Sequence, residues 1–250
     1  YFGVGVSGGE EGALKGPSIM PSGDKDAYAS IGKILEDISA KKDGEPCCTY
    51  IGPEGSGHYV KMVHNGIEYA DMQLLAETYL ILKYTVGYTN SEIADVLEQW
   101  NQGDVQSYLV DITVTVLREK DSVTEHDLVD VILDVAGNKG TGRWTSIEAL
   151  RQEFNASLLT AAYQARIMSN QLALRDAYRK EITNDKKNVD IDKVHQAYKL
   201  AKTIAFAQGF DLYRDASNKY SWDLNLKQIA AIFRAGCIIQ AKLLQDIMHA

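Results

Sequence analysis

The strongest chemical signal in the chain is a stripe of four polar side chains on one expected helix: Lys61, His64, Asn65 and Glu68. They stand at positions i, i+3, i+4 and i+7, which brings their side chains to one face of a helix. An amine, an imidazole, an amide and a carboxylate grouped in this way suit acid–base chemistry on a small polar substrate. The alternative is that the stripe is the solvated face of an amphipathic helix.

The helix that must carry this stripe is expected from about Ser56 to Val86. Glycines lead into it, and no proline interrupts it. Apolar residues lie largely around its other sides and require a core to bury them: Val60, Val63, Ile67, Leu74 and Leu75.

Helical periodicity extends over most of the remaining chain. All four prolines lie at or before Pro53, which predicts an all-α body after a loop-rich start. We divide the chain into a connecting segment, 1–55, with a short strand and one helix, and an all-helical domain, 56–250. Further helices are expected at 24–42, 89–100, 104–118, 128–135, 147–179, 191–218 and 225–248, with Asp24 as one cap and capping boxes at Thr89–Glu92 and Thr124–Asp127.

A glycine-rich turn near the start of the chain is a candidate anion site. Ser7, Gly8 and Gly9 begin a segment, 7–23, so rich in glycine and proline that we expect it to be irregular. Backbone N–H groups of such a loop can close on a carboxylate or phosphate, although an ordinary surface turn is the alternative. The spacing G-x-G-x-x-G also occurs in 1–8, but we reject a dinucleotide site because glycines and prolines, not a helix, are expected to follow.

A second glycine cluster, GNKGTGRWT at 137–145, resembles a phosphate-binding loop. Arg143 and Trp144 stand where that motif needs lysine and then serine or threonine, so the motif fails. Lys139, Thr141 and free backbone N–H groups could still bind a phosphate. The alternative is a turn between two helices.

Composition excludes several classes of protein. The 250 residues, 45% hydrophobic, suffice for one large core or two modest ones. The net charge of -8 argues against general nucleic-acid binding, and the apolar runs are too short to span a bilayer. Cys47, Cys48 and Cys237 provide neither a disulfide framework nor a zinc-site spacing. We therefore expect no metal, nucleic acid or membrane as a partner, and reduced thiols in the cytoplasm.

Four segments together carry a resemblance to a known family. VSGGEEGALKGPSIMPSG, IGPEGSGHYVKMVHNGIEYADMQLLAE, GNKGTGRWT and WDLNLKQIAAIFRAGCIIQAKLL, in this order and spacing, resemble the 6-phosphogluconate dehydrogenases. Other β-hydroxyacid dehydrogenases share a shorter glycine, lysine and asparagine arrangement, but SGGEEGA and GIEY favour the phosphogluconate branch. The resemblance implies conversion of 6-phosphogluconate to ribulose 5-phosphate and CO2 with reduction of NADP, in the pentose phosphate pathway, by a homodimer.

The resemblance also implies a role for individual positions. Lys61 corresponds to the general base and Glu68 to the general acid. The carboxylate end of the substrate would be held by Ser7, Gly8 and Gly9, and its hydroxyls would be contacted by His64 and Asn65. The phosphate side would consist of Tyr69, Lys139, Thr141 and Arg166.

This chemistry requires two shifted pKa values. Lys61 can take the proton of the carbon-3 hydroxyl only when it is neutral, so its pKa must fall from the ordinary value of about 10.4. Glu68 must be protonated to give a proton to carbon 1, so its pKa must rise. The two residues are seven positions apart, about 10.5 Å along a helix, which suits action on different carbons of one sugar acid.

The chain departs from the family in several places. Ala70, Phe233 and Ala235 replace glycine, tryptophan and glycine, and Arg143 replaces lysine, but none of these is a catalytic type. The family's Rossmann domain would precede Tyr1, so the cofactor-binding residues are unknown, and its C-terminal tail would follow Ala250. We therefore predict that this chain alone does not turn over.

Two other interpretations remain open. In another β-hydroxyacid dehydrogenase, such as a hydroxyisobutyrate type, Lys139, Thr141 and Arg166 would be scattered rather than clustered near Tyr69. In a non-catalytic helical dimerisation scaffold, the stripe that begins at Lys61 would face bulk solvent.

Overall fold

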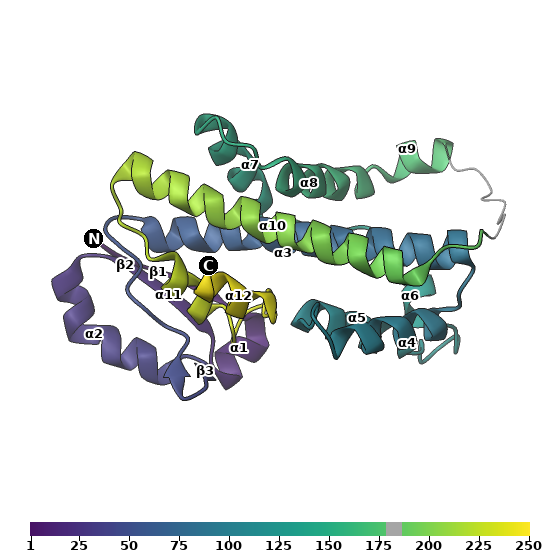
Figure 1. The fold of residues 1–250 in the computed structure, drawn as a ribbon, viewed down its shortest axis with the longest axis horizontal. Coiled ribbons are helices and arrows are strands. Elements are labelled where there is room, and N and C mark those ends of the chain that lie inside the picture. The colour runs from purple at the N-terminus through teal and green to yellow at the C-terminus, as the bar shows by residue number, and fades with distance from the viewer. Residues whose placement is uncertain (179–186) are drawn as a thin grey trace.

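The computed structural model describes residues 1–178 and 187–250, and helices dominate it (Figure 1). The prediction of an all-α body with a short strand segment at its start is confirmed. In chain order the elements are β1 (Phe2–Ser7), α1 (Gly9–Lys15), β2 (Ser18–Gly23), α2 (Lys25–Ile38), β3 (Lys41–Lys42), β4 (Glu45–Pro46), α3 (Ser56–Leu80), the π-helix η1 (Ile81–Val86), α4 (Asn90–Asn101), α5 (Tyr108–Arg118), α6 (Leu128–Val131), α7 (Thr141–Arg151), α8 (Ser157–Ser169), α9 (Leu172–Ala177), α10 (Ile191–Tyr220), α11 (Leu226–Ile232) and α12 (Leu243–His249).

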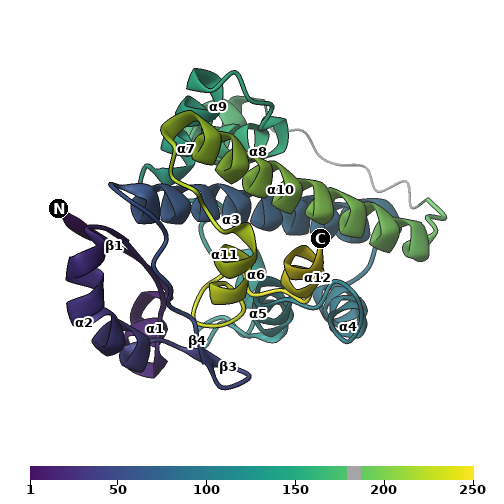
Figure 2. The same cartoon turned by 60° about the vertical axis from the view of Figure 1, so that its left-hand side comes forward.

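Two long helices, α3 and α10, run side by side through the middle of the molecule (Figures 1 and 2). Helices α7 and α8 pack along one side of α3, and the pair α4 and α5 lies on the other. The first turns of α3 contact the β1–β2 pair. The helix that carries the polar stripe is therefore enclosed by neighbours rather than lying on a surface.

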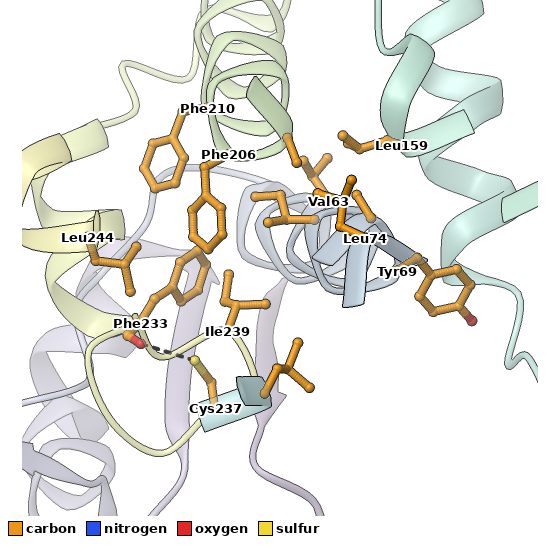
Figure 3. Packing of buried hydrophobic residues seen from close by; sticks show 14 of the residues in the cluster. Val63, Tyr69, Leu74, Leu159, Phe206, Phe210, Phe233, Cys237, Ile239 and Leu244 are labelled. Atoms are coloured by element: carbon orange, nitrogen blue, oxygen red, sulfur yellow. Dashed lines mark hydrogen bonds between the residues drawn. The ribbon is translucent and has the colours of Figure 1, made fainter. Parts of the chain in front are cut away.

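Apolar side chains of α3 form the centre of the core, as Figure 3 shows around Val63 and Leu74. Val63 and Ile67 have no exposed surface. Glycines allow the neighbouring helices to approach closely: an added Cβ at Gly209 of α10 would lie 2.4 Å from Ile67, and one at Gly66 of α3 would lie 2.7 Å from Thr145 of α7. These contacts fix the rotation of α3 about its axis.

A buried ion pair joins the two long helices. Lys202 of α10 donates to Asp71 of α3 at 2.7 Å and to Ser107 at 2.9 Å, and Tyr198 donates to the second oxygen of Asp71 at 3.0 Å. Lys202 and Asp71 are 2% and 1% exposed. Because each charge is paired and hydrogen-bonded, the network is tolerated in the core, and it ties α3, α10 and the start of α5 together.

The prediction that 7–23 is irregular is wrong. Helix α1 follows β1, and β2 pairs antiparallel with β1, with Pro21 opposite Val4. A proline is tolerated because β2 is an edge strand of this two-stranded sheet. The carbonyl of Pro21 accepts a hydrogen bond from the backbone N–H of Ile51. We rejected the dinucleotide motif because no helix was expected after these glycines, and that reason is wrong, since α1 follows β1. The motif still does not apply, because it requires a parallel βαβ unit and β1 and β2 are antiparallel.

The expected helix at 225–248 is broken into α11 and α12. The chain turns at Gly236, whose φ of 69° lies in the left-handed region. An added Cβ at Gly236 would lie 2.7 Å from the Cβ of Ala40 and from the backbone of Pro17 and Ser18. Tertiary packing against the N-terminal segment therefore overrides the apolar periodicity of this stretch.

Helix ends agree with the sequence at some positions and differ at others. Asp24 caps α2, although this helix stops at Ile38, and both hydrogen bonds of the Thr89–Glu92 capping box are present. Thr124 does not cap α6; it donates to Asp121, and α6 ends at Val131. The expected helix at 147–179 is divided among α7, α8 and α9, and Arg179 lies outside the described residues. Within the described ranges, no helix combines the length and the apolar character needed to cross a bilayer.

Candidate active site

Two of the other polar residues of α3, His64 and Asn65, contact the side chain of Lys61. Its ammonium lies 2.9 Å from Ser7 Oγ, 2.7 Å from Asn65 Oδ1 and 3.3 Å from His64 Nδ1. Glu68 lies one turn further, with its Oε2 3.8 Å from His64 Nδ1. The predicted stripe therefore forms one connected cluster, and Ser7 from β1 completes it.

His64 is the buried member of this cluster, with no exposed surface. Its Nδ1 lies 3.0 Å from Asn65 Oδ1, and its Nε2 lies 3.4 Å from Ser7 Oγ. The Asn65 amide nitrogen donates to Thr141 at 2.9 Å, so its oxygen faces His64. A proton on Nδ1 satisfies this geometry, because Nδ1–H then donates to Asn65 and Nε2 accepts from the Ser7 hydroxyl.

The pKa values of the two expected catalytic groups are displaced in the directions that the chemistry requires. Burial lowers the pKa of Lys61, while the negative charge of Glu68 partly opposes this shift. Burial raises the pKa of Glu68, and the charges of Lys61 and Arg166 partly oppose that shift. Burial and the nearby Lys61 charge together hold the pKa of His64 well below its usual range. An amine poised to lose a proton and a carboxyl poised to keep one thus share one helix face.

The Ser7–Gly8–Gly9 turn lies where β1 ends and α1 begins. Ser7 is buried, and Gly8 and Gly9 have positive φ values of 128° and 58°. An added Cβ at Gly8 would lie 2.7 Å from the carbonyl oxygen of Gly236, so a glycine is needed there. The segment that follows α11 therefore packs against this turn, next to the cluster around Lys61.

Three of the four residues expected on the phosphate side lie close together. The guanidinium of Arg166 stacks over the ring of Tyr69 at 3.7 Å and donates to the carbonyl of Gly137 at 2.8 Å. An added Cβ at Gly142, next to Thr141, would lie 2.6 Å from the Tyr69 ring. Arg166 of α8 and Gly142 of α7, the residue after Thr141, therefore contact Tyr69 from two helices.

Lys139 is placed differently from the other three. Its side chain is exposed, in the loop before α7 that Arg166 holds through Gly137. The structure thus brings its loop to the site but leaves its ammonium in solvent.

A cleft of about 820 Å³ borders the cluster and is wide enough for a small sugar acid. Lys61 and Thr141 line it on the side of the cluster. Aromatic side chains line the remainder: Tyr59, Trp144 and Trp222. The amine of Lys61 is therefore accessible to a ligand, while His64 and Ser7 beside it are buried.

Sequence reasoning missed the segment 233–237, which packs beneath the site. The ring of Phe233 lies edge-on to His64 at 4.9 Å, and Gly236 supports Gly8. Cys237 is buried near Lys61; burial raises the pKa of its thiol, and the positive charge of Lys61 partly opposes this shift. The sequence marked Phe233 only as a departure from the family, because a helix was expected to continue through it.

Comparison with known families assigns nearly all of the chain. Residues 57–250 match the family described as "6-phosphogluconate dehydrogenase, C-terminal domain", and residues 1–52 match the "NAD binding domain of 6-phosphogluconate dehydrogenase".

Individual relatives agree with this assignment. The decarboxylating 6-phosphogluconate dehydrogenase of Raoultella terrigena is 53% identical over 257 residues, and the NADP(+)-dependent enzyme of Bacillus subtilis is 50% identical over 259 residues. Both alignments cover 100% of this chain, but 58% and 55% of the relatives. A solved structure of the Plasmodium falciparum enzyme superposes with a TM-score of 0.94 at 43% identity, covering 100% of this chain and 55% of that one.

The chain thus spans little more than half the length of these relatives, while the family matches account for both its strand segment and its helical body. By the extent of the match to residues 57–250, together with the conserved architecture of the solved relative, the chain belongs to the 6-phosphogluconate dehydrogenase family.

Proposed function

We propose that this chain supplies the substrate-binding and acid–base part of a decarboxylating 6-phosphogluconate dehydrogenase. The observation that carries the proposal is the pairing of Lys61 and Glu68 on one face of α3, with pKa values displaced in opposite directions. The named relatives act on 6-phosphogluconate, and the Plasmodium falciparum structures include complexes with NADP+ and with 6-phosphogluconate. In this proposal residues 1–55 end a dinucleotide-binding domain, and residues 56–250 form the substrate and dimerisation domain.

The proposed reaction needs two proton transfers that these residues can perform. Neutral Lys61 takes the proton of the carbon-3 hydroxyl while a hydride leaves carbon 3, which gives a β-keto acid. The keto acid loses CO2 because its ketone accepts the electrons of the broken bond, and protonated Lys61 stabilises the oxygen that becomes negative. Protonated Glu68 then delivers a proton to carbon 1 of the enediol, which gives ribulose 5-phosphate.

The hydride acceptor in this proposal is NADP. The antiparallel β1–β2 pair does not form a dinucleotide site by itself, so no step is assigned to residues of this chain toward the cofactor. Their contribution is to hold the sugar acid and move its protons.

Substrate orientation follows from the two ends of the cluster. The Ser7–Gly9 turn would bind the carboxylate, and Asn65 and His64 would contact the hydroxyls. Tyr69, Thr141 and Arg166 would hold the phosphate, with Lys139 reaching it from its exposed loop. The stacking of Arg166 on Tyr69 favours this arrangement over a hydroxyisobutyrate-type enzyme, which needs no phosphate site. The burial of His64 favours a site over a scaffold with a solvated stripe.

A homodimer in a reducing compartment, the cytoplasm, completes the proposal. Support for the dimer comes from exposed apolar side chains on α8 and α9, among them Met168 and Leu174. The free, buried thiols of Cys47, Cys48 and Cys237 support the compartment. Light scattering that shows a monomer at micromolar concentration would contradict the dimer.

Binding and turnover can be tested separately. Isothermal titration calorimetry of the 250-residue chain should show binding of 6-phosphogluconate and weaker binding of gluconate, which lacks the phosphate. A chimera, in which this chain replaces the matching region of the Bacillus subtilis relative, should reduce NADP with 6-phosphogluconate, whereas the chain alone should not. A folded chimera that is inactive with NADP and with NAD would reject the proposed function.

A further inference from the structure

The segment that follows α11 reaches the catalytic cluster through one aromatic ring. Phe233 has no exposed surface, and its ring points toward Phe206 in the core (Figure 3). Its ring centroid lies 4.9 Å from that of His64, with the two planes at 72°. This edge-to-face contact covers His64 on the side of the core and fills space that water could otherwise occupy.

The ionisable groups near His64 act on its charge in opposite directions. The titratable groups near it are Lys61 and Glu68 on α3, Tyr213 on α10 and Cys237 in the segment after α11. Burial raises the pKa of the Cys237 thiol to about 12 and holds that of Tyr213 well above its usual range, so both are neutral. Lys61 opposes a positive charge on His64, whereas ionised Glu68 would favour one.

A neutral imidazole satisfies the hydrogen bonds around Lys61 without bringing a second positive charge beside it. With Nδ1–H donating to Asn65, the unprotonated Nε2 can accept from the Ser7 hydroxyl, whose oxygen is then free to accept from Lys61 at 2.9 Å. A proton on Nε2 would reverse the Ser7 hydroxyl and place a second positive charge 3.3 Å from the Lys61 nitrogen. His64 could then also give or take the proton that is assigned to Lys61.

We propose that Phe233 is a positioning residue of the site, whose ring excludes water from His64 and keeps the imidazole uncharged, so that Lys61 is the single proton acceptor facing the cleft. The assignment of Lys61 as the acceptor rests on the proposed function, but the state of His64 does not. The segment 233–237 thereby acts on the chemistry through His64, without touching the substrate.

The test is a histidine titration followed by NMR on the 250-residue chain with ¹³C-labelled histidine. The signal of His64 is assigned by its loss in His64→Asn. In the parent chain it should show no titration between about pH 5.5 and 8, the range around the ordinary histidine pKa of about 6.5. In Phe233→Ala it should titrate within that range, because water reaches the ring. In Phe233→Trp, which keeps an aromatic cover, it should again stay silent.

Leu97→Ala is the control for a general loosening of the core. Leu97 is 1% exposed and lies in α4, which packs on α5 and η1. The His64 signal should show no titration between about pH 5.5 and 8 in this variant. Where Phe233→Ala fails to fold by circular dichroism, Phe233→Leu takes its place, with a smaller shift in the same direction.

The outcomes separate this inference from the proposed function. A titrating His64 in the Phe233 variant and a silent one in Leu97→Ala support the inference. A silent His64 in the folded Phe233 variant, or equal titration in Leu97→Ala, overturns it. An inactive chimera combined with the expected titrations would reject the proposed function and leave the role of Phe233 standing.

Discussion

Lys61 donates to the amide oxygen of Asn65 at 2.7 Å, one helical turn along α3. The same amide donates from its nitrogen to Thr141 of α7 at 2.9 Å, so its orientation is fixed from a second helix. Asn65 therefore holds the Lys61 amine over the cleft and at the same time joins the acid–base face of α3 to the expected phosphate side. Four predictions follow from contacts of this kind.

Replacing Lys61 with methionine should remove turnover while keeping the fold. Lys61 is the group proposed to accept the hydroxyl proton, and loss of a general base costs about 10²–10⁴-fold in rate. The chimera carrying Lys61→Met should lose at least that much in kcat, measured by NADPH absorbance. Lys15→Met, which changes an exposed lysine paired with Glu11, is the control and should leave kcat unchanged. Near-normal turnover in Lys61→Met would refute its role as base.

Replacing Glu68 with glutamine should change how stability depends on pH. Burial raises the folded-state pKa of Glu68 above its ordinary value of about 4.5. Between that value and the folded pKa, the folded chain holds a proton that the unfolded chain has lost, so stability falls as pH rises through this window. Glu68→Gln removes this loss, and urea unfolding should show its largest gain over the parent above the window and none at its acid end.

Glu77→Gln is the matched control for this measurement, because Glu77 lies on the same helix with an exposed side chain. Its stability difference from the parent should not follow the same pH course. A pH-independent difference for Glu68→Gln would show that the Glu68 carboxyl is not perturbed.

Adding a methyl group at Gly142 should damage the phosphate side. The new Cβ would lie 2.6 Å from the Tyr69 ring. Tyr69 is 5% exposed and its ring is covered by Arg166, so the ring cannot easily move away. Overpacking of this kind costs about 1–3 kcal/mol, more than the roughly 0.5–1 kcal/mol that alanine gains over glycine in a helix. Gly142→Ala should therefore unfold at lower urea and bind 6-phosphogluconate more weakly by calorimetry.

Gly137→Ala serves as its control, because a Cβ there would meet nothing within 4 Å. Equal effects of the two substitutions on stability and binding would mean that the contact with Tyr69 is not the cause.

Breaking the buried pair of Asp71 and Lys202 should destabilise the chain strongly. Asp71→Asn leaves the ammonium of Lys202 buried without its countercharge, a situation that costs about 3–5 kcal/mol. The double variant Asp71→Asn/Lys202→Met removes that charge and should recover part of the loss in urea unfolding. Glu11→Gln, which breaks the exposed pair with Lys15, should leave the midpoint of urea unfolding nearly unchanged, because solvent screens such a pair. A small effect of Asp71→Asn would mean that water reaches this pair.

The sequence predicts what depends on local spacing. The stripe from Lys61 to Glu68, the long helix that carries it and the capping box at Thr89 all follow from contacts within a few residues, and the structure contains each of them. The resemblance added Ser7 and Thr141, which lie far from α3 in the chain but contact the cluster.

Features that depend on long-range packing were not predictable in this way. Gly236 interrupts an apolar helical pattern because Ala40 and Pro17 occupy the space that a continuing helix would need. The contact of Phe233 with His64 arises only from this turn, and the buried pair of Asp71 with Lys202 joins residues 131 positions apart. The exposed position of Lys139 likewise depends on how its loop enters α7.

The close approach of glycines to α3 limits how this family can change in length. At Gly66 and at Gly209, an added Cβ would lie less than 3 Å from a side chain of the neighbouring helix. The helices are therefore packed too closely for α3 to rotate. One residue inserted between Lys61 and Glu68 would turn everything beyond it by about 100° and shift it by about 1.5 Å. Insertions and deletions that survive in homologues should therefore fall in the connecting loops, and the spacing between amine and carboxyl should stay constant even where their neighbours differ.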